Sequence, residues 1–150
     1  MNKTWYYEDC IPGASYQSGP VEVSEEGIIA FARQFDPQPF HTDPEAAHET
    51  FFRGLAASGW HTAALTMRMV VESENQLAGG VIGMGVEELR WPRPVRPGDV
   101  LTLKCEVLEA RLSNSMPDRG IVKMQNTTFN QRQETVQIMK VNLIVLRRNQ

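Results

Sequence analysis

The second half of the chain alternates apolar and polar residues with a period of two. From residue 101 to 107, leucine, cysteine and valine at the odd positions alternate with threonine, lysine and glutamate at the even ones. This alternation is typical of a β-strand with one buried face. Segments 81–90, 121–130 and 136–146 predict three further strands, the last with the strongest pattern. Residues 96–99 (Arg-Pro-Gly-Asp) predict a turn between the first two strands. Because no helix is expected among these four strands, they are predicted to pair as an antiparallel meander.

The first half of the chain shows helical spacing in place of this alternation. Ser24 is a typical helix N-cap, and the acidic residues that follow it suit the positive end of a helix. This helix is expected to stop at residue 35 or 36, because Pro37 and Pro39 disfavour helical geometry in the residue before each of them. Residues 36–42 are therefore predicted to form a stiff, non-helical loop. The sequence Asp43-Pro44-Glu45 then predicts a new helix start.

The most hydrophobic helix is predicted from about Ala57 to Leu77. Apolar residues recur along it at helical spacing, and others lie on its remaining faces, so this helix is expected to be buried. The first set comprises Trp60, Ala63, Ala64, Met67, Val70 and Val71. An antiparallel sheet with one apolar face needs a cover, and this helix is the one available. The predicted fold is α+β, one domain over residues 1–150 whose antiparallel sheet wraps around a single long central helix.

Composition and charge argue against several classes of function. Fifteen basic and eighteen acidic side chains give a net charge of −3, which does not predict the basic surface of a nucleic-acid-binding protein. No stretch approaches the roughly 20 apolar residues that a membrane-spanning helix needs, and the first ten residues carry no apolar run of a signal peptide. Cys10 and Cys105 stand far apart, and the three histidines lack zinc-ligand spacing, so no metal site is predicted. We expect a cytoplasmic protein without nucleic-acid or membrane partners.

Asp36 and His41 form the first candidate site. They lie five positions apart on a backbone stiffened by two prolines, which can hold two side chains in a set relation. A carboxylate and an imidazole can divide proton handling between them. The alternative is that Asp36 caps the preceding helix and that His41 is a packed loop residue.

Gly59 marks the second candidate site, at the start of the predicted apolar helix. The N–H groups at a helix start lack internal partners and carry partial positive charge. A glycine there would let a ligand carbonyl come close, which predicts an oxyanion site. The alternative is that Gly59 permits tight packing of the helix on the sheet.

Together these two features resemble the MaoC-like dehydratases and (R)-specific enoyl-CoA hydratases, a family with the hot-dog fold. That family carries Asp-x-Asn-Pro-aliphatic-His, and residues 36–41 read Asp-Pro-Gln-Pro-Phe-His. The continuation through Pro44 and the segment 89–99 are also similar to the family pattern. Two positions depart from it: Gln38 replaces the family's asparagine, and Ser58 stands where the family commonly has the histidine of a His-Gly pair.

The resemblance implies a lyase of fatty acid metabolism that hydrates 2-enoyl thioesters or dehydrates 3-hydroxyacyl thioesters. It implies that Asp36 and His41 hold a catalytic water, that the Gly59 N–H binds the thioester oxygen, and that Ser58 and Gln38 contribute to substrate binding. The substrate would be an acyl-coenzyme A or acyl-carrier thioester, with no further cofactor. A homodimer or a dimer-based assembly is expected.

Two other functions remain open from the sequence. A hot-dog thioesterase usually places its acid on the central helix, but residues 57–71 contain no aspartate or glutamate. A non-catalytic acyl-thioester-binding subunit would keep the pocket without turnover, and the two departures from the motif leave room for this reading.

Overall fold

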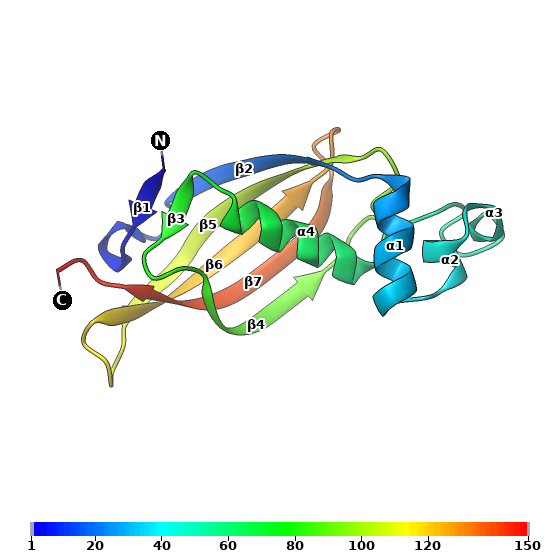
Figure 1. Cartoon of the computed structure of the whole chain (residues 1–150). Helices are drawn as coiled ribbons and strands as arrows, with labels where there is room; N and C mark the ends of the chain where they lie inside the picture. Colours follow the sequence, from blue (N-terminus) through cyan, green and yellow to red (C-terminus); the bar gives the residue numbers. More distant parts are fainter. Residues whose placement is uncertain (1, 150) are drawn as a thin grey trace.

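The computed structural model describes residues 2–149, which form a curved antiparallel sheet with one long helix against its concave face (Figure 1). The strands are β1 (Lys3–Trp5), β2 (Ser15–Glu22), β3 (Asn75–Leu77), β4 (Ile82–Arg90), β5 (Val100–Leu112), β6 (Arg119–Phe129) and β7 (Thr135–Leu146). The α-helices are α1 (Glu25–Phe35), α2 (Pro39–Thr42), α3 (Pro44–Ala47) and α4 (Gly59–Val71), and a 3₁₀ turn spans Tyr7–Asp9. Helices α1 to α3 lie beyond one end of the sheet, and both chain ends lie at the other. The predicted α+β hot-dog architecture is confirmed.

The five-stranded sheet has the order β2-β5-β6-β7-β4. Strands β5, β6 and β7 form the predicted meander, and Cys105, Asn126 and Met139 lie in register across it. The predicted pairing of the first two strands is wrong, because β4 pairs with β7 at the opposite edge from β2. Nine residues separate β4 from β5, three of them prolines, and this extended connection crosses from one side of the sheet to the other. The turn at residues 96–99 therefore belongs to a crossover and not to a hairpin.

Helix α4 is shorter than the apolar pattern predicted. It begins at Gly59, two residues later than expected, and ends at Val71, six residues earlier. Beyond it, the Asn75 N–H donates to the Ser73 hydroxyl at 3.0 Å, a local turn that competes with helical hydrogen bonding. Residues 75–77 instead form β3, which pairs in parallel with β1.

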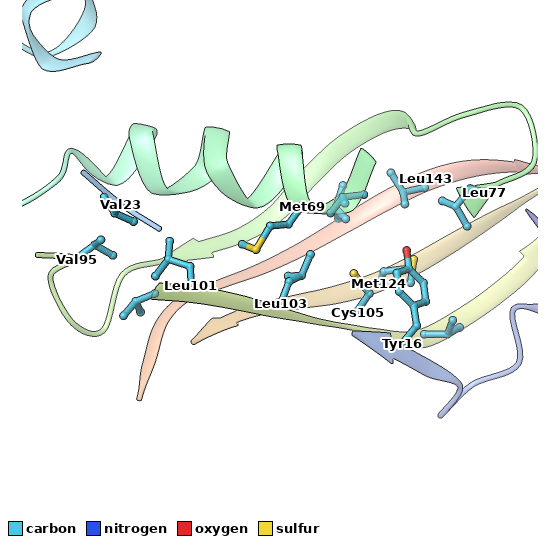
Figure 2. Close-up of a cluster of buried hydrophobic side chains, with 14 of the residues drawn as sticks. Tyr16, Val23, Met69, Leu77, Val95, Leu101, Leu103, Cys105, Met124 and Leu143 are labelled. Atoms are coloured by element: carbon cyan, nitrogen blue, oxygen red, sulfur yellow. The ribbon is translucent and has the colours of Figure 1, made fainter. Parts of the chain in front are cut away.

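One face of α4 packs on the sheet, and the other is open in this single chain. Figure 2 shows Met69 of α4 beside Leu101 and Leu103 of β5, with Met124 of β6 and Leu143 of β7 farther along the same layer. All five are at most 4% exposed, and full burial of such a side chain stabilises the fold by about 1.5–3 kcal/mol. The expectation of a fully buried helix is wrong here, because the opposite face carries apolar side chains that are 44–60% exposed. These are Trp60, Met67 and Val71.

The helices beyond the end of the sheet follow their capping residues. Ser24 caps α1 by accepting a hydrogen bond from the Gly27 N–H at 3.0 Å, as its position predicted. The predicted helix after Asp43 is also present, with the carboxylate accepting from two backbone N–H groups of α3. The loop over residues 36–42 is not wholly non-helical, because Pro39 occupies the first turn of the one-turn helix α2, where its missing N–H costs nothing. Among the described residues, no helix combines the length and hydrophobicity needed to span a membrane.

Candidate active site

Asp36 and His41 are brought together by the end of α1 and by α2. Asp36 is the C-cap of α1, where its N–H donates to the Ala32 carbonyl at 2.8 Å and the backbone leaves helical geometry. After Pro37, helix α2 returns the chain so that the imidazole faces the carboxylate. Asp36 Oδ2 lies 3.4 Å from His41 Nε2, and the histidine is only 5% exposed. Asp36 thus occupies the capping position considered above, yet its side chain points at His41.

The orientation of the His41 ring is set by a backbone carbonyl. His41 Nδ1 lies 2.6 Å from the Ala56 carbonyl oxygen, which can only accept a hydrogen bond, so Nδ1 carries the proton. In the neutral ring, Nε2 then presents its lone pair toward Asp36. The rings of Phe40 and Phe52 pack around the imidazole at centroid distances of 4.6 and 5.9 Å.

Both residues that depart from the family motif contact Asp36. Gln38 Nε2 donates to Asp36 Oδ1 at 2.6 Å, which leaves Oδ2 facing His41. The fully buried Ser58 hydroxyl is placed to donate to this carboxylate and contributes to lowering its pKa. Burial raises the pKa of Asp36, but the hydrogen bonds from Gln38 and Ser58 and the electrostatic effect of the His41 imidazole outweigh it, so the pKa lies below its ordinary value. The charged carboxylate is therefore the favoured form.

Gly59 lies at the first helical position of α4, directly after Ser58. The Ser58 hydroxyl accepts from the Trp60 N–H at 3.3 Å, whereas the Gly59 N–H has no hydrogen-bond acceptor within residues 2–149. A Cβ added at Gly59 would lie 2.5 Å from a ring carbon of Trp91, so the glycine accommodates the indole. Tight packing against Trp91 therefore explains why this position is a glycine. The Gly59 N–H is a separate feature: it lies at the positive end of α4 and is free to donate to a ligand.

Comparison with known proteins identifies the family. Residues 10–129 match the model of the MaoC like domain. The chain belongs to the MaoC-like dehydratase family. It is 50% identical to a MaoC-like dehydratase from Rhodospirillum rubrum, with 97% of this chain and 99% of the other covered and a TM-score of 0.93. An R-hydratase from Pseudomonas aeruginosa is 26% identical, with 95% and 86% covered and a TM-score of 0.75. An uncharacterized protein, YdeM, from Bacillus subtilis is 30% identical over 89% of this chain and 92% of its own length.

Arg96 has a structural role in this MaoC-like domain that the sequence did not predict. Its guanidinium donates to the carbonyls of Phe52 (2.6 Å), Gly54 (3.0 Å) and Leu55 (3.3 Å), and so holds the segment that leads to Ala56. This segment presents the carbonyl that orients His41. No local pattern identifies such a role, because the partners lie more than 40 residues apart in the chain.

The other histidines lie outside the pair. His61 is stacked on Phe31 at a centroid distance of 4.8 Å, and its buried Nδ1 has no partner among the described residues. Burial lowers the pKa of His61. His48 is exposed on the surface after α3. Residues 2–149 contain no group of three or more His, Cys, Asp or Glu side chains arranged to hold a metal ion.

Proposed function

We propose that the protein is a hydratase/dehydratase acting on 2-enoyl and 3-hydroxyacyl thioesters. The observation that carries the proposal is the Asp36–His41 pair, with Oδ2 and Nε2 3.4 Å apart and the imidazole tautomer set by Ala56. Membership of the MaoC-like family and the likeness to an R-hydratase support it. The substrate is a coenzyme A or carrier-protein thioester of fatty acid metabolism, and no other cofactor is required.

The pair is suited to hold one water molecule. The Asp36 carboxylate accepts hydrogen bonds, and so does the Nε2 lone pair of the His41 tautomer that carries its proton on Nδ1. Two acceptors 3.4 Å apart can each bind one hydrogen of the same water at ordinary hydrogen-bond distances of about 2.7–3.0 Å. Both hydrogens are then occupied, and a lone pair of the water oxygen is directed away from the pair, toward an approaching substrate.

The reaction follows from this placement. The water oxygen forms a bond to the β-carbon while the pair accepts one of its protons, and the π electrons shift toward the α-carbon and the thioester oxygen. The proton then passes to the α-carbon, so one water has been added across the double bond; the reverse sequence is the dehydration. The Gly59 N–H donates to the thioester oxygen as negative charge develops there, and loss of one such donor costs other enzymes about 10²–10³ in kcat.

Gln38 and Ser58 have a direct part in this scheme. Both favour the charged carboxylate of Asp36, and the bond from Gln38 to Oδ1 leaves Oδ2 for the water. The longer Gln38 side chain thereby replaces the family's asparagine through a contact with Asp36. Hydrolysis is less well supported, because helix α4 contains no aspartate or glutamate that a thioesterase of this fold would use.

We also propose that the protein is a homodimer. Strand β4 forms one edge of the sheet, and its outer backbone edge is free to pair with another strand. Apolar side chains that are 42–60% exposed gather on this strand and on the open face of α4, an area that a second copy would cover. They are Trp60, Met67, Val71, Ile82, Met84 and Val86.

The test is hydration of trans-2-butenoyl-CoA, followed by loss of the enoyl absorbance. Asp36→Ala and His41→Ala should each lower kcat by about 10²–10⁴ while the circular dichroism spectrum is kept. The exposed His48 and the half-buried Asp118, which pairs with Arg119, supply controls, because His48→Ala and Asp118→Ala remove the same kinds of side chain away from the site. Release of free thiol would favour the thioesterase, and binding without turnover would favour the non-catalytic subunit. Near-normal turnover in either site variant would refute the mechanism.

A further inference from the structure

The indole of Trp91 packs against Gly59, the first residue of α4. Trp91 follows the last residue of β4 and opens the crossover that leads to β5. An ideal Cβ on Gly59 would lie 2.5, 2.7 and 2.7 Å from three carbons of the indole, far inside the normal contact distance. The Gly59 Cα is therefore packed against the indole ring. A movement of the ring would change the contact that holds the first residue of α4.

The indole is itself fixed by a fully buried set of polar side chains. Trp91 Nε1–H donates to Gln137 Oε1 at 2.9 Å, and Gln137 Nε2 donates to Thr66 Oγ1 at 3.0 Å. Thr66 Oγ1 lies 2.7 Å from Thr128 Oγ1. Gln137, Thr66 and Thr128 are each at most 1% exposed, and such satisfied buried networks rigidify what they hold. Since Thr66 is on α4 itself, two turns after Gly59, the network ties ring, sheet and helix together.

The segment that precedes Gly59 is held from other sides. The Ala56 N–H donates to the Phe40 carbonyl at 3.0 Å, and the Ala57 N–H donates to the Val95 carbonyl at 2.9 Å. The next two N–H groups along this anchored chain, those of Ser58 and Gly59, have no acceptor within the described residues. Gly59 has no side chain that could anchor this part of the backbone, so contact with Trp91 supplies the remaining restraint.

We infer that Trp91 is a positioning residue, whose indole, held by Gln137, fixes the direction of the Gly59 N–H toward the thioester oxygen. This inference rests on the proposed function, in which that N–H stabilises the developing enolate. Electrostatic stabilisation depends on donors that are in place before the reaction, within about 0.5 Å of the productive geometry. Loosening the ring therefore lowers kcat, and has little effect on ground-state binding.

The test compares Trp91→Phe with Trp5→Phe. Trp91→Phe keeps an aromatic ring and removes the N–H that donates to Gln137. Trp5 supplies a matched control, because its indole makes the same kind of bond, to Asn75 Oδ1 at 3.1 Å, at the far end of the sheet. Each variant leaves one amide oxygen without its donor. The readouts are the free energy of unfolding, kcat and KM on trans-2-butenoyl-CoA, and the ¹H–¹⁵N residual dipolar coupling of the Gly59 amide, which reports the direction of the N–H bond.

W91F is expected to lower kcat roughly 10- to 100-fold with KM changed less than about twofold, whereas W5F keeps kcat within about twofold at a similar loss of stability. The residual dipolar coupling of the Gly59 N–H should change in W91F and stay the same in W5F. Equal kcat values in the two variants, or an unchanged Gly59 coupling in W91F, would overturn the inference. A wild-type protein that does not hydrate the thioester would instead overturn the proposed function, and the coupling would still report whether Trp91 orients the Gly59 N–H.

Discussion

Substitution of Gly59 by alanine is the most direct test of why a glycine begins α4. The added methyl would lie 2.5 Å from Trp91 Cε2, whereas carbon atoms in contact prefer about 3.5–4.0 Å. The ring and the helix must therefore separate by about 1 Å or more. Overpacking of this kind costs about 1–3 kcal/mol, and the lower conformational entropy of unfolded alanine offsets about 0.4–1 kcal/mol of it. The net expectation is a loss of about 1–2 kcal/mol in the free energy of unfolding.

A double-mutant cycle separates this steric cause from a requirement for ligand approach. Trp91→Ala removes the ring that the new methyl meets, so Gly59→Ala should cost less in that background. The expected coupling between the two changes is about 0.5–3 kcal/mol, measured by urea denaturation of the four proteins. Trp5→Ala provides the control background, because that indole packs beside Tyr16 and away from Gly59, and the two changes should add within about 0.5 kcal/mol.

Two outcomes would refute the reasoning. Additive costs for Gly59→Ala and Trp91→Ala would mean that the ring does not determine the glycine. A Gly59→Ala protein with unchanged stability and reduced kcat would mean that the residue type serves the approach of the ligand, as the sequence first suggested.

Three further results are expected. Gln38→Leu should destabilise the protein near pH 7, and the loss should shrink as pH falls below the ordinary aspartate pKa of 3.8, because the lowered pKa of Asp36 contributes stability that is present above that value and is lost as pH falls through the folded-state value; urea denaturation at a series of pH values measures it. His61→Phe should weaken the loss of stability as pH falls below about 6.5, because burial lowers the pKa of His61 in the folded state and the unfolded state binds the proton first; urea denaturation at a series of pH values measures this. Met67→Glu places a charge on the open face of α4. Sedimentation equilibrium should then shift from dimer toward monomer, with the circular dichroism spectrum unchanged. An unchanged dimer would argue against that face as the interface.

The parts of the fold that could be predicted from the sequence depend on neighbouring residues. Ser24 and Asp43 cap their helices through bonds to N–H groups two or three positions away. The alternation in β5 reflects a buried face that repeats every second residue. The Asp36–His41 pair is also local, since one helix end and one helical turn bring the two side chains together.

Long-range pairing left no such pattern. Strand β4 could pair with β5 or with β7 as far as its sequence is concerned, and the crossover through residues 91–99 decides between them only in three dimensions. The carbonyl that orients His41 lies 15 residues away, and the amide that holds Trp91 lies 46 residues away. An apolar residue on α4 looks the same in the sequence whether it packs on the sheet, like Met69, or stays open, like Met67.

The two departures from the family motif illustrate the same limit at the site itself. By sequence alone, Gln38 and Ser58 counted as weakened matches, because a longer amide and a hydroxyl replace the usual side chains. In the structure, the extra methylene lets the Gln38 amide reach back two residues to Asp36 Oδ1, and the Ser58 hydroxyl joins it on the same carboxylate. The effect of each replacement therefore depends on which atom it contacts. Both replacements favour the charged form of Asp36, and the proposed reaction needs Asp36 in that form.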